Sequence, residues 1–311
     1  MEQFCAASRQ LIAATLGRNR ASKLIGATRD ARKSEDFLLN RNAGAIVERI
    51  FWGPFLCCAL ACVFLLSSQV QSASSGSEES SSPAETAGPP VKIPSADQIL
   101  AHYIDAVGGR AAWAKLNSRV SAGTIKVTGL NVMGTVEIHE KAPNRMLTVV
   151  KIGDTSFRQG FDGKIGWTED PQNGLREQAG PELAETQRES DFYSPLNFRN
   201  HYAKFTVDGL EKVDGRDAFV LQATVAGEDD PDKIYFDAQS GLPIRILGHH
   251  HSPAGNSWFV EDLGDYREID GVKLPFSIAQ TSMDSEFTVE ISEVHHNVAL
   301  EDSQFSKPAV Q

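Results

Sequence analysis

The hydrophobic positions of the chain follow a helical period first and a strand period later. A stripe at helical spacing begins after Pro94 and ends at Gly108-Gly109. Ser95 and Gln98 have the spacing of a capping box, which predicts that a helix begins there. A second short helix is expected over residues 111–116, with Trp113 and Leu116 facing inward. The apolar stripe of the first helix consists of Ile99, Leu100, Tyr103, Ile104 and Val107.

From about Val120 the period changes to two, which is typical of half-buried strands. Turns such as Asp162-Gly163, Asp214-Gly215 and Asp270-Gly271 separate the runs, and Asp-Gly between apolar runs indicates a hairpin. Residues 181–200 break the pattern and predict one or two inserted helices. The pattern therefore predicts a mainly β, α+β domain over residues 95–308. Its curved antiparallel sheet, or half-barrel, has about ten to twelve strands and a few covering helices.

An uncharged run of seventeen residues, 50–66, precedes this domain. A transmembrane helix needs about 17–25 apolar residues, and a signal peptide has a shorter apolar core followed by small residues. The length and the Ser- and Ala-containing sequence after Leu66 favour a signal peptide, and a single-pass anchor is the alternative. Residues 1–49 are then a basic tail, or the product of a start site placed too early. Residues 67–94 form a Ser/Pro-rich linker. Either topology places the domain outside the cytoplasm, in the periplasm of a bacterial envelope.

Net charge and cysteine content exclude some partners and some kinds of site. The formal net charge is −11. Residues 1–49 are basic, with nine Lys/Arg and five Asp/Glu, so the excess of acidic residues lies in the part after the apolar run. Phosphate repels an acidic domain, so nucleic acid is not an expected partner. All four cysteines lie at or before residue 62, and the predicted domain therefore has neither disulfides nor thiolate metal sites.

Several hairpin motifs resemble those of LolA/LolB-like proteins, a superfamily related to outer-membrane lipoprotein sorting. They are the helix ending at residues 103–109 with Trp113 and Leu116, and the segments 161–167, 234–243 and 266–276. The resemblance covers roughly residues 95–300. It implies a half-open curved sheet closed by helices around an apolar cavity for acyl chains, and it implies a lipid or a lipidated protein as the partner. The motifs are mainly turn residues, so they specify the fold more than an activity.

Aromatic side chains on or near the predicted strands are the candidates for a ligand cavity. We expect a subset of them to line a pocket that admits an acyl chain, and the rest to be ordinary core. The candidates are Phe157, Phe161, Trp167, Phe192, Phe198, Phe219, Phe236, Trp258 and Phe276.

The run His249-His250-His251 is the most conspicuous polar cluster. On a strand, His249 and His251 share a face. His295-His296 lie on another predicted strand, and a metal site would require these histidines to converge with a carboxylate such as Glu261 or Asp262. The alternative is an exposed strand end before the loop at 252–256, and we predict no metal centre and no cofactor.

The residues after the apolar run contain no nucleophile elbow, phosphate-binding glycine loop, zinc-protease helix motif or Cys-x-x-Cys pair. The sequence therefore predicts a protein that is not an enzyme and that binds a lipid, lipoprotein acyl chains or another hydrophobic ligand in envelope biogenesis. Two alternatives stay open: an accessory envelope protein that binds a protein partner, and a metal-dependent enzyme that uses the histidines.

Overall fold

A computed structural model describes residues 92–309, apart from 130–131, 254 and 283–284. The segments 1–49 and 50–66 and all but the last residues of the linker 67–94 lie outside the described residues, so their predicted roles stay predictions. Within the described ranges, no helix combines the length and the apolar composition needed to cross a bilayer.

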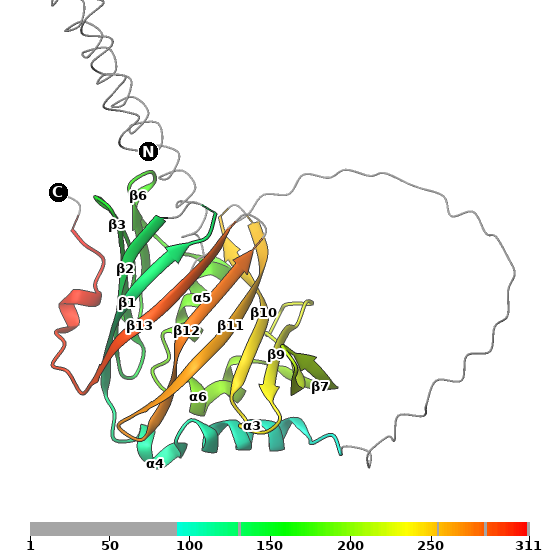
Figure 1. Cartoon of the computed structure of the whole chain (residues 1–311). Coiled ribbons are helices and arrows are strands. Elements are labelled where there is room, and N and C mark those ends of the chain that lie inside the picture. Colours follow the sequence, from blue (N-terminus) through cyan, green and yellow to red (C-terminus); the bar gives the residue numbers. More distant parts are fainter. Residues whose placement is uncertain (1–91, 130–131, 254, 283–284, 310–311) are drawn as a thin grey trace, which may run out of the picture. The chain divides into compact units, whose positions relative to one another are not determined.

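The described chain forms one thirteen-stranded antiparallel sheet and a few helices, so the predicted mainly β architecture is confirmed (Figure 1). The α-helices are α3 (Ala96–Ala106), α4 (Gly109–Trp113), α5 (Gly180–Glu189) and α6 (Ser194–Asn197). The 3-10 helices are η1 (Phe198–His201) and η2 (Asp302–Phe305). The strands are β1 (Ser118–Val127), β2 (Val132–Lys141), β3 (Arg145–Ile152), β4 (Thr155–Phe161), β5 (Gly166–Asp170), β6 (Gly174–Glu177), β7 (Lys204–Val213), β8 (Arg216–Thr224), β9 (Asp232–Asp237), β10 (Pro243–Ser252), β11 (Gly255–Ile269), β12 (Val272–Ser282) and β13 (Glu286–His296).

Almost every neighbouring pair of strands is also consecutive in sequence. The order across the sheet is β6-β5-β4-β3-β2-β1-β13-β12-β11-β10-β9-β8-β7. The first and last strands pair with each other in the middle, and the two edges, β6 and β7, are joined by the segment that contains α5, α6 and η1. This segment therefore has to run from one edge of the sheet to the other.

The sheet is strongly curved and does not close. Helix α5 contacts both β5 and β10, although seven strands lie between these two in the sheet. A flat sheet would hold them far apart, because neighbouring strands are about 4.8 Å apart. The sheet thus bends around α5, as the half-barrel prediction required (Figure 1).

Strand number is where the prediction falls short. The short edge strand β6, Gly174–Glu177, contains little hydrophobic pattern and was not expected. Conversely, Gly264-Asp265 separates two hydrophobic runs in the sequence, around 257–263 and 266–269, yet both runs belong to the single long strand β11. Asp265 takes a left-handed φ of 47° within it, but pairing with β12 continues on both sides. Backbone pairing therefore outweighs the local turn propensity of Gly264-Asp265.

The two N-terminal helices fit tightly against one end of the sheet. The predicted capping box is present, with Ser95 and Gln98 exchanging side-chain and backbone hydrogen bonds at the start of α3. Gly108, at φ 108°, separates α3 from α4, and a Cβ there would lie 2.1 Å from the carbonyl oxygen of Gly271. The amide of Lys273 donates to the carbonyl of Val107 at 3.1 Å. This close contact fixes the helices over the start of β12 and so positions one wall of the cavity described next.

Candidate functional site: a cavity between the helices and the sheet

A cavity of about 300 Å³ lies between the helices and one face of the sheet. Ligand pockets for drug-sized molecules span about 300–1,000 Å³, so this cavity is at the small end of that range. Its wall is drawn from α3, α4, the α5–η1 segment and strands β1, β2 and β9 to β12. Its apolar wall includes Val107, Trp113, Phe192, Phe198, Phe236 and Leu263.

Aromatic rings at the α3 side of the cavity pack edge to face. The rings of Tyr103 and Phe198 are 6.1 Å apart at 79°, and Phe198 and Phe236 are 6.4 Å apart at 83°. Such geometries are favourable for aromatic pairs. Burial raises the pKa of Tyr103 and of Tyr266, which both line the cavity, so both hydroxyls stay neutral. The aromatic groups on this side of the cavity are therefore uncharged and packed against one another.

The structure divides the nine aromatic candidates among several environments. Phe192, Phe198 and Phe236 line the 300 Å³ cavity, and Phe219 borders a smaller one with Phe236. Phe157, Phe161, Trp167 and Phe276 are fully buried in the core, and the side chain of Trp258 is 46% exposed. Binding of a ligand by the first group stays a prediction.

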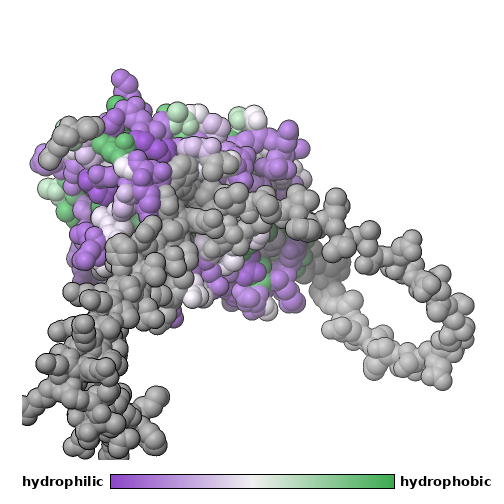
Figure 2. Space-filling model, turned by 90° about the horizontal axis from the view of Figure 1, so that it is seen from above, coloured by the Kyte–Doolittle hydropathy of each residue, from purple (hydrophilic) through white to green (hydrophobic). Residues whose placement is uncertain are grey.

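The visible outer face has no large apolar patch. The face in Figure 2 is mostly hydrophilic, with small, separate hydrophobic patches. The large hydrophobic residues that are exposed in the described part of the chain are Ile93, Met133 and Trp258, which lie far apart in sequence. An apolar ligand would therefore gain most by entering the cavity.

Polar groups interrupt the apolar wall at one place in particular. Arg119 on β1 and Glu140 on β2 are direct partners in the sheet register. The Arg119 Nε and Nη2 groups donate to the two Glu140 carboxylate oxygens at 2.6 and 2.8 Å, and both side chains are mostly buried. Glu189 and Asp191, at the end of α5 and just after it, also line the cavity. Hydrogen bonds from His201 and Asn197 outweigh burial and lower the pKa of Asp191.

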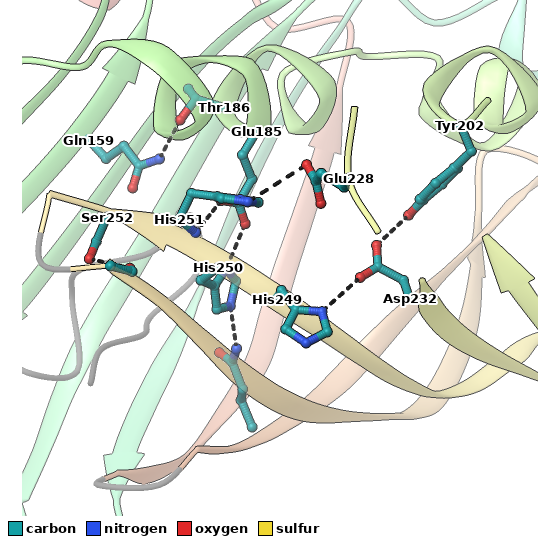
Figure 3. A network of polar contacts seen from close by, with 12 residues as sticks. Gln159, Glu185, Thr186, Tyr202, Glu228, Asp232, His249, His250, His251 and Ser252 are labelled. Atoms are coloured by element: carbon teal, nitrogen blue, oxygen red, sulfur yellow. Dashed lines mark hydrogen bonds and ion pairs between the residues drawn. The ribbon is translucent and has the colours of Figure 1, made fainter. Parts of the chain in front are cut away.

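A buried network of histidines and carboxylates joins α5 to β10 beside this cavity (Figure 3). The His250 Nδ1 lies 2.7 Å from Glu185 Oε1, and its Nε2 lies 2.9 Å from Gln280 Nε2. The His251 amide donates to Glu185 Oε2 at 2.8 Å, and its Nδ1 lies 3.3 Å from the same oxygen. The His250 ring also stacks on Phe259 at 4.0 Å.

The environment divides the nearby carboxyl groups into charged and neutral ones. Burial disfavours the charge of Glu185, but hydrogen bonds from His250 and His251 outweigh it, so the pKa of Glu185 is lowered. Burial and the charge of Glu185, one helical turn away, raise the pKa of Glu189 well above its ordinary value. Burial, followed by the charge of Asp262, raises the pKa of Glu261 to about 7.

The structure corrects two expectations for the histidine run. It is not an exposed strand end, because His250 and His251 are buried. The residues that converge are also different: His250 and His251 share Glu185, whereas His249 lies 3.9 Å from Asp232. Asp262 forms an ion pair with Arg245, and His295 and His296 lie on β13, which β12 and β11 separate from β10.

Glu185, Glu189 and His250 are the group that comes nearest to a metal site in the described ranges. One ligand atom from each lies within 4.8 Å of the others. However, both ring nitrogens of His250 and both oxygens of Glu185 already have hydrogen-bond partners in the protein. Binding a metal would require these bonds to break, so the geometry fits a structural network better than a metal centre.

Sequence reasoning missed Arg119, Glu140 and Glu185. The alternating pattern begins only after Arg119, at about Val120, and it gives no register between this strand and the one that ends near Glu140. Glu185 was recognised only as part of a helix, although its spacing of four from Glu189 puts both carboxyl groups on one helix face. Two carboxyl groups on one face of a predicted helix were the only sequence signal that this helix could contribute to a polar site.

No family model matches the chain, and no curated protein matches it. Among solved structures, similar folds occur in a DUF1329 family protein from Desulfovibrio piger (13% identity, 68% of this chain and 96% of that chain, TM-score 0.48). They also occur in a putative outer membrane lipoprotein-sorting protein domain from Vibrio parahaemolyticus (13% identity, 68% of this chain and 95% of that chain, TM-score 0.44). A third similar fold is that of a LolA superfamily protein from Nitrosomonas europaea (14% identity, 68% of this chain and 97% of that chain, TM-score 0.44). The printed descriptions of the second and third proteins name the group that the hairpin motifs resemble. Matches at these identities assign no functional residue to this chain.

Proposed function

We propose that this protein binds an apolar, chain-like ligand without catalysing a reaction, and that the ligand is a lipid or the acyl chain of a lipidated protein. The observation that carries the proposal is the 300 Å³ cavity with its largely aromatic and aliphatic wall. Burial of each CH₂ group in such a cavity is worth about 0.8 kcal/mol. The small volume suits one short or medium chain better than several.

The proposal includes a location outside the cytoplasm. Its support is the order of segments in the sequence, in which the apolar run 50–66 and the linker 67–94 precede the domain at 95–308. In this arrangement the run either guides export and is removed or keeps the protein at the membrane. N-terminal sequencing of the protein from cells separates the two, since cleavage gives a first residue near Ala73 and an anchor leaves Met1 in place.

Replacing Leu263 by Trp is expected to weaken binding of an apolar probe at least tenfold. Leu263 lines the cavity, and the larger indole fills part of the space that the ligand needs. The measurement is fluorescence titration with the uncharged dye N-phenyl-naphthylamine, using protein isolated from cells that express the full chain. Lipid extraction and mass spectrometry of the same sample would identify a ligand that co-purifies.

Met133→Trp is the matched control, because Met133 is 62% exposed and does not line the cavity. The control should bind the dye as the unchanged protein does, and thermal unfolding should show that both variants fold. Equal dye affinity in the Leu263 variant and the unchanged protein would refute binding in this cavity. A protein that takes up no dye and carries no lipid would favour the alternative of an accessory protein with a protein partner.

A further inference from the structure

One nitrogen of the cavity residue Arg119 is left without a hydrogen-bond partner. Its Nε and Nη2 groups are both committed to Glu140, whereas Nη1 is buried and has no partner in the described part of the chain. Among the residues that line the cavity, only Arg119 and Glu189 carry such a buried, unpartnered side-chain atom. The two buried atoms of the wall that lack a hydrogen-bond partner therefore belong to a guanidinium group and a carboxyl group.

A buried guanidinium N–H group that lacks an acceptor has lost its hydration without replacement, which costs free energy. Arginine donates through five N–H groups in a planar fork, so the bidentate pair with Glu140 fixes the plane of the guanidinium and leaves Nη1 as the nitrogen that Glu140 does not use. An acceptor on a bound ligand would restore the lost hydrogen bond. A charged acceptor would do so more strongly than a neutral one.

The other ionisable groups of the wall are compatible with an anion, since burial and the charge of Glu185 raise the pKa of Glu189 and keep this carboxyl group neutral. Lys273 adds a second cation, and its ammonium forms no ion pair within the ranges that the structure describes. Asp191 is already satisfied by Asn197 and His201. Glu140 is held in the pair with Arg119, so neither of these carboxylates is an unpaired negative charge facing the ligand.

From this geometry we infer that the ligand carries an anionic oxygen group, a carboxylate or a phosphate, at one end of its apolar chain, and that this group accepts a hydrogen bond from Arg119. The inference rests on the proposed function, because it assigns the polar end of the ligand whose chain occupies the cavity. It excludes a purely hydrocarbon ligand as the preferred occupant.

Competition for bound N-phenyl-naphthylamine by three ligands with the same chain tests the inference. Decanoic acid and decyl phosphate supply the two anionic groups, and decanol supplies a neutral one. The acid, the phosphate or both should compete at least roughly tenfold more strongly than the alcohol, since hydrogen bonds to charged groups are the stronger class. Whichever of the two anions binds better identifies the headgroup class.

Arg119→Lys should remove that preference, because it should weaken competition by decanoic acid and decyl phosphate much more than competition by decanol. A lysine ammonium can pair with Glu140, but it lacks the planar fork that holds a further N–H group in place. Arg245→Lys is the matched control, because Arg245 also pairs with a carboxylate on the neighbouring strand, Asp262, and does not line the cavity. If Arg119→Lys does not fold, the double variant Arg119→Gln, Glu140→Gln removes both charges and serves in its place.

The outcomes separate this inference from the proposed function. Equal competition by acid, phosphate and alcohol overturns the headgroup assignment and leaves chain binding standing. An anion preference that survives Arg119→Lys and the double variant overturns the role of Arg119. If none of the three ligands displaces the dye, or no dye binds, chain binding fails and the headgroup assignment fails with it.

Discussion

Replacing Glu185 by alanine is expected to lower the free energy of unfolding by about 3–5 kcal/mol, because each buried donor that loses its acceptor costs about 1–3 kcal/mol. Glu185 is buried and accepts hydrogen bonds from both His250 and His251. Without it, a buried imidazole and a backbone amide lose their acceptor at once. The same carboxylate ties α5 to β10, so its loss also weakens the contact that holds the helix inside the curved sheet.

Thermal and urea unfolding measure this effect. For a domain of this size, about 1 kcal/mol shifts the midpoint by about 2–4 °C, so the Glu185→Ala variant should melt at least about 6 °C lower. Gln187→Ala is the matched control, since Gln187 lies two residues away on the exposed side of the same helix. The free energy of unfolding of the control should lie within about 0.5 kcal/mol of that of the unchanged protein. If the free energy of unfolding of the Glu185→Ala variant also lies within that range, the network contributes little to stability.

The parts of the fold that local sequence determines were predictable. The capping box at Ser95 and the glycines after Val107 fix the first helix, because each acts on residues within one or two turns. The hairpins at Asp214-Gly215 and Asp270-Gly271 have positive φ at both positions, as expected for their turn type. The edge strand β6 was missed, because its four residues carry too little pattern to be distinguished from a loop.

The candidate site depends on contacts between distant segments, which no local pattern contains. Phe161 and Phe236 have similar surroundings in the sequence, yet one is core and the other lines the cavity. The curvature of the sheet and the path of α5 to η1 decide this difference. Likewise, His250 and Glu185 are 65 residues apart, and their contact follows from the same bend. Periodicity gives the face on which a side chain lies, but not what that face meets.

The cavity and the network belong to one structural arrangement. Helix α5 supplies Glu185 to the network and Glu189 to the cavity wall, and strand β11 carries Phe259 at the network and Leu263 at the cavity. The buried polar groups therefore hold the helix that forms one side of the cavity. This arrangement buries several carboxyl groups, which costs free energy when they are charged. That cost should be measurable as a dependence of stability on pH.

Glu261→Gln is expected to stabilise the protein by about 3 kcal/mol at pH 8 and to have almost no effect at pH 4. Burial and the charge of Asp262 raise the pKa of Glu261 from 4.5 to about 7 in the folded protein. Below the unfolded pKa the group is protonated in both states. Above it, the unfolded chain releases its proton first, so the contribution of this group to stability decreases from about pH 4.5 and is lost as the pH rises through 7. One pKa unit corresponds to about 1.4 kcal/mol, which gives the stated size.

Glutamine has nearly the shape of a protonated glutamate but cannot ionise, so the difference in unfolding free energy between Glu261→Gln and the unchanged protein isolates this titration. Urea unfolding at several pH values between 4 and 8 measures it. Glu268→Gln, on the exposed part of the same strand, is the control and should show no comparable growth with pH. If the difference for Glu261 also stays constant across this range, Glu261 does not keep its proton in the folded protein. The interior beside the cavity would then have to accommodate its charge, either by admitting water or by supplying a cation.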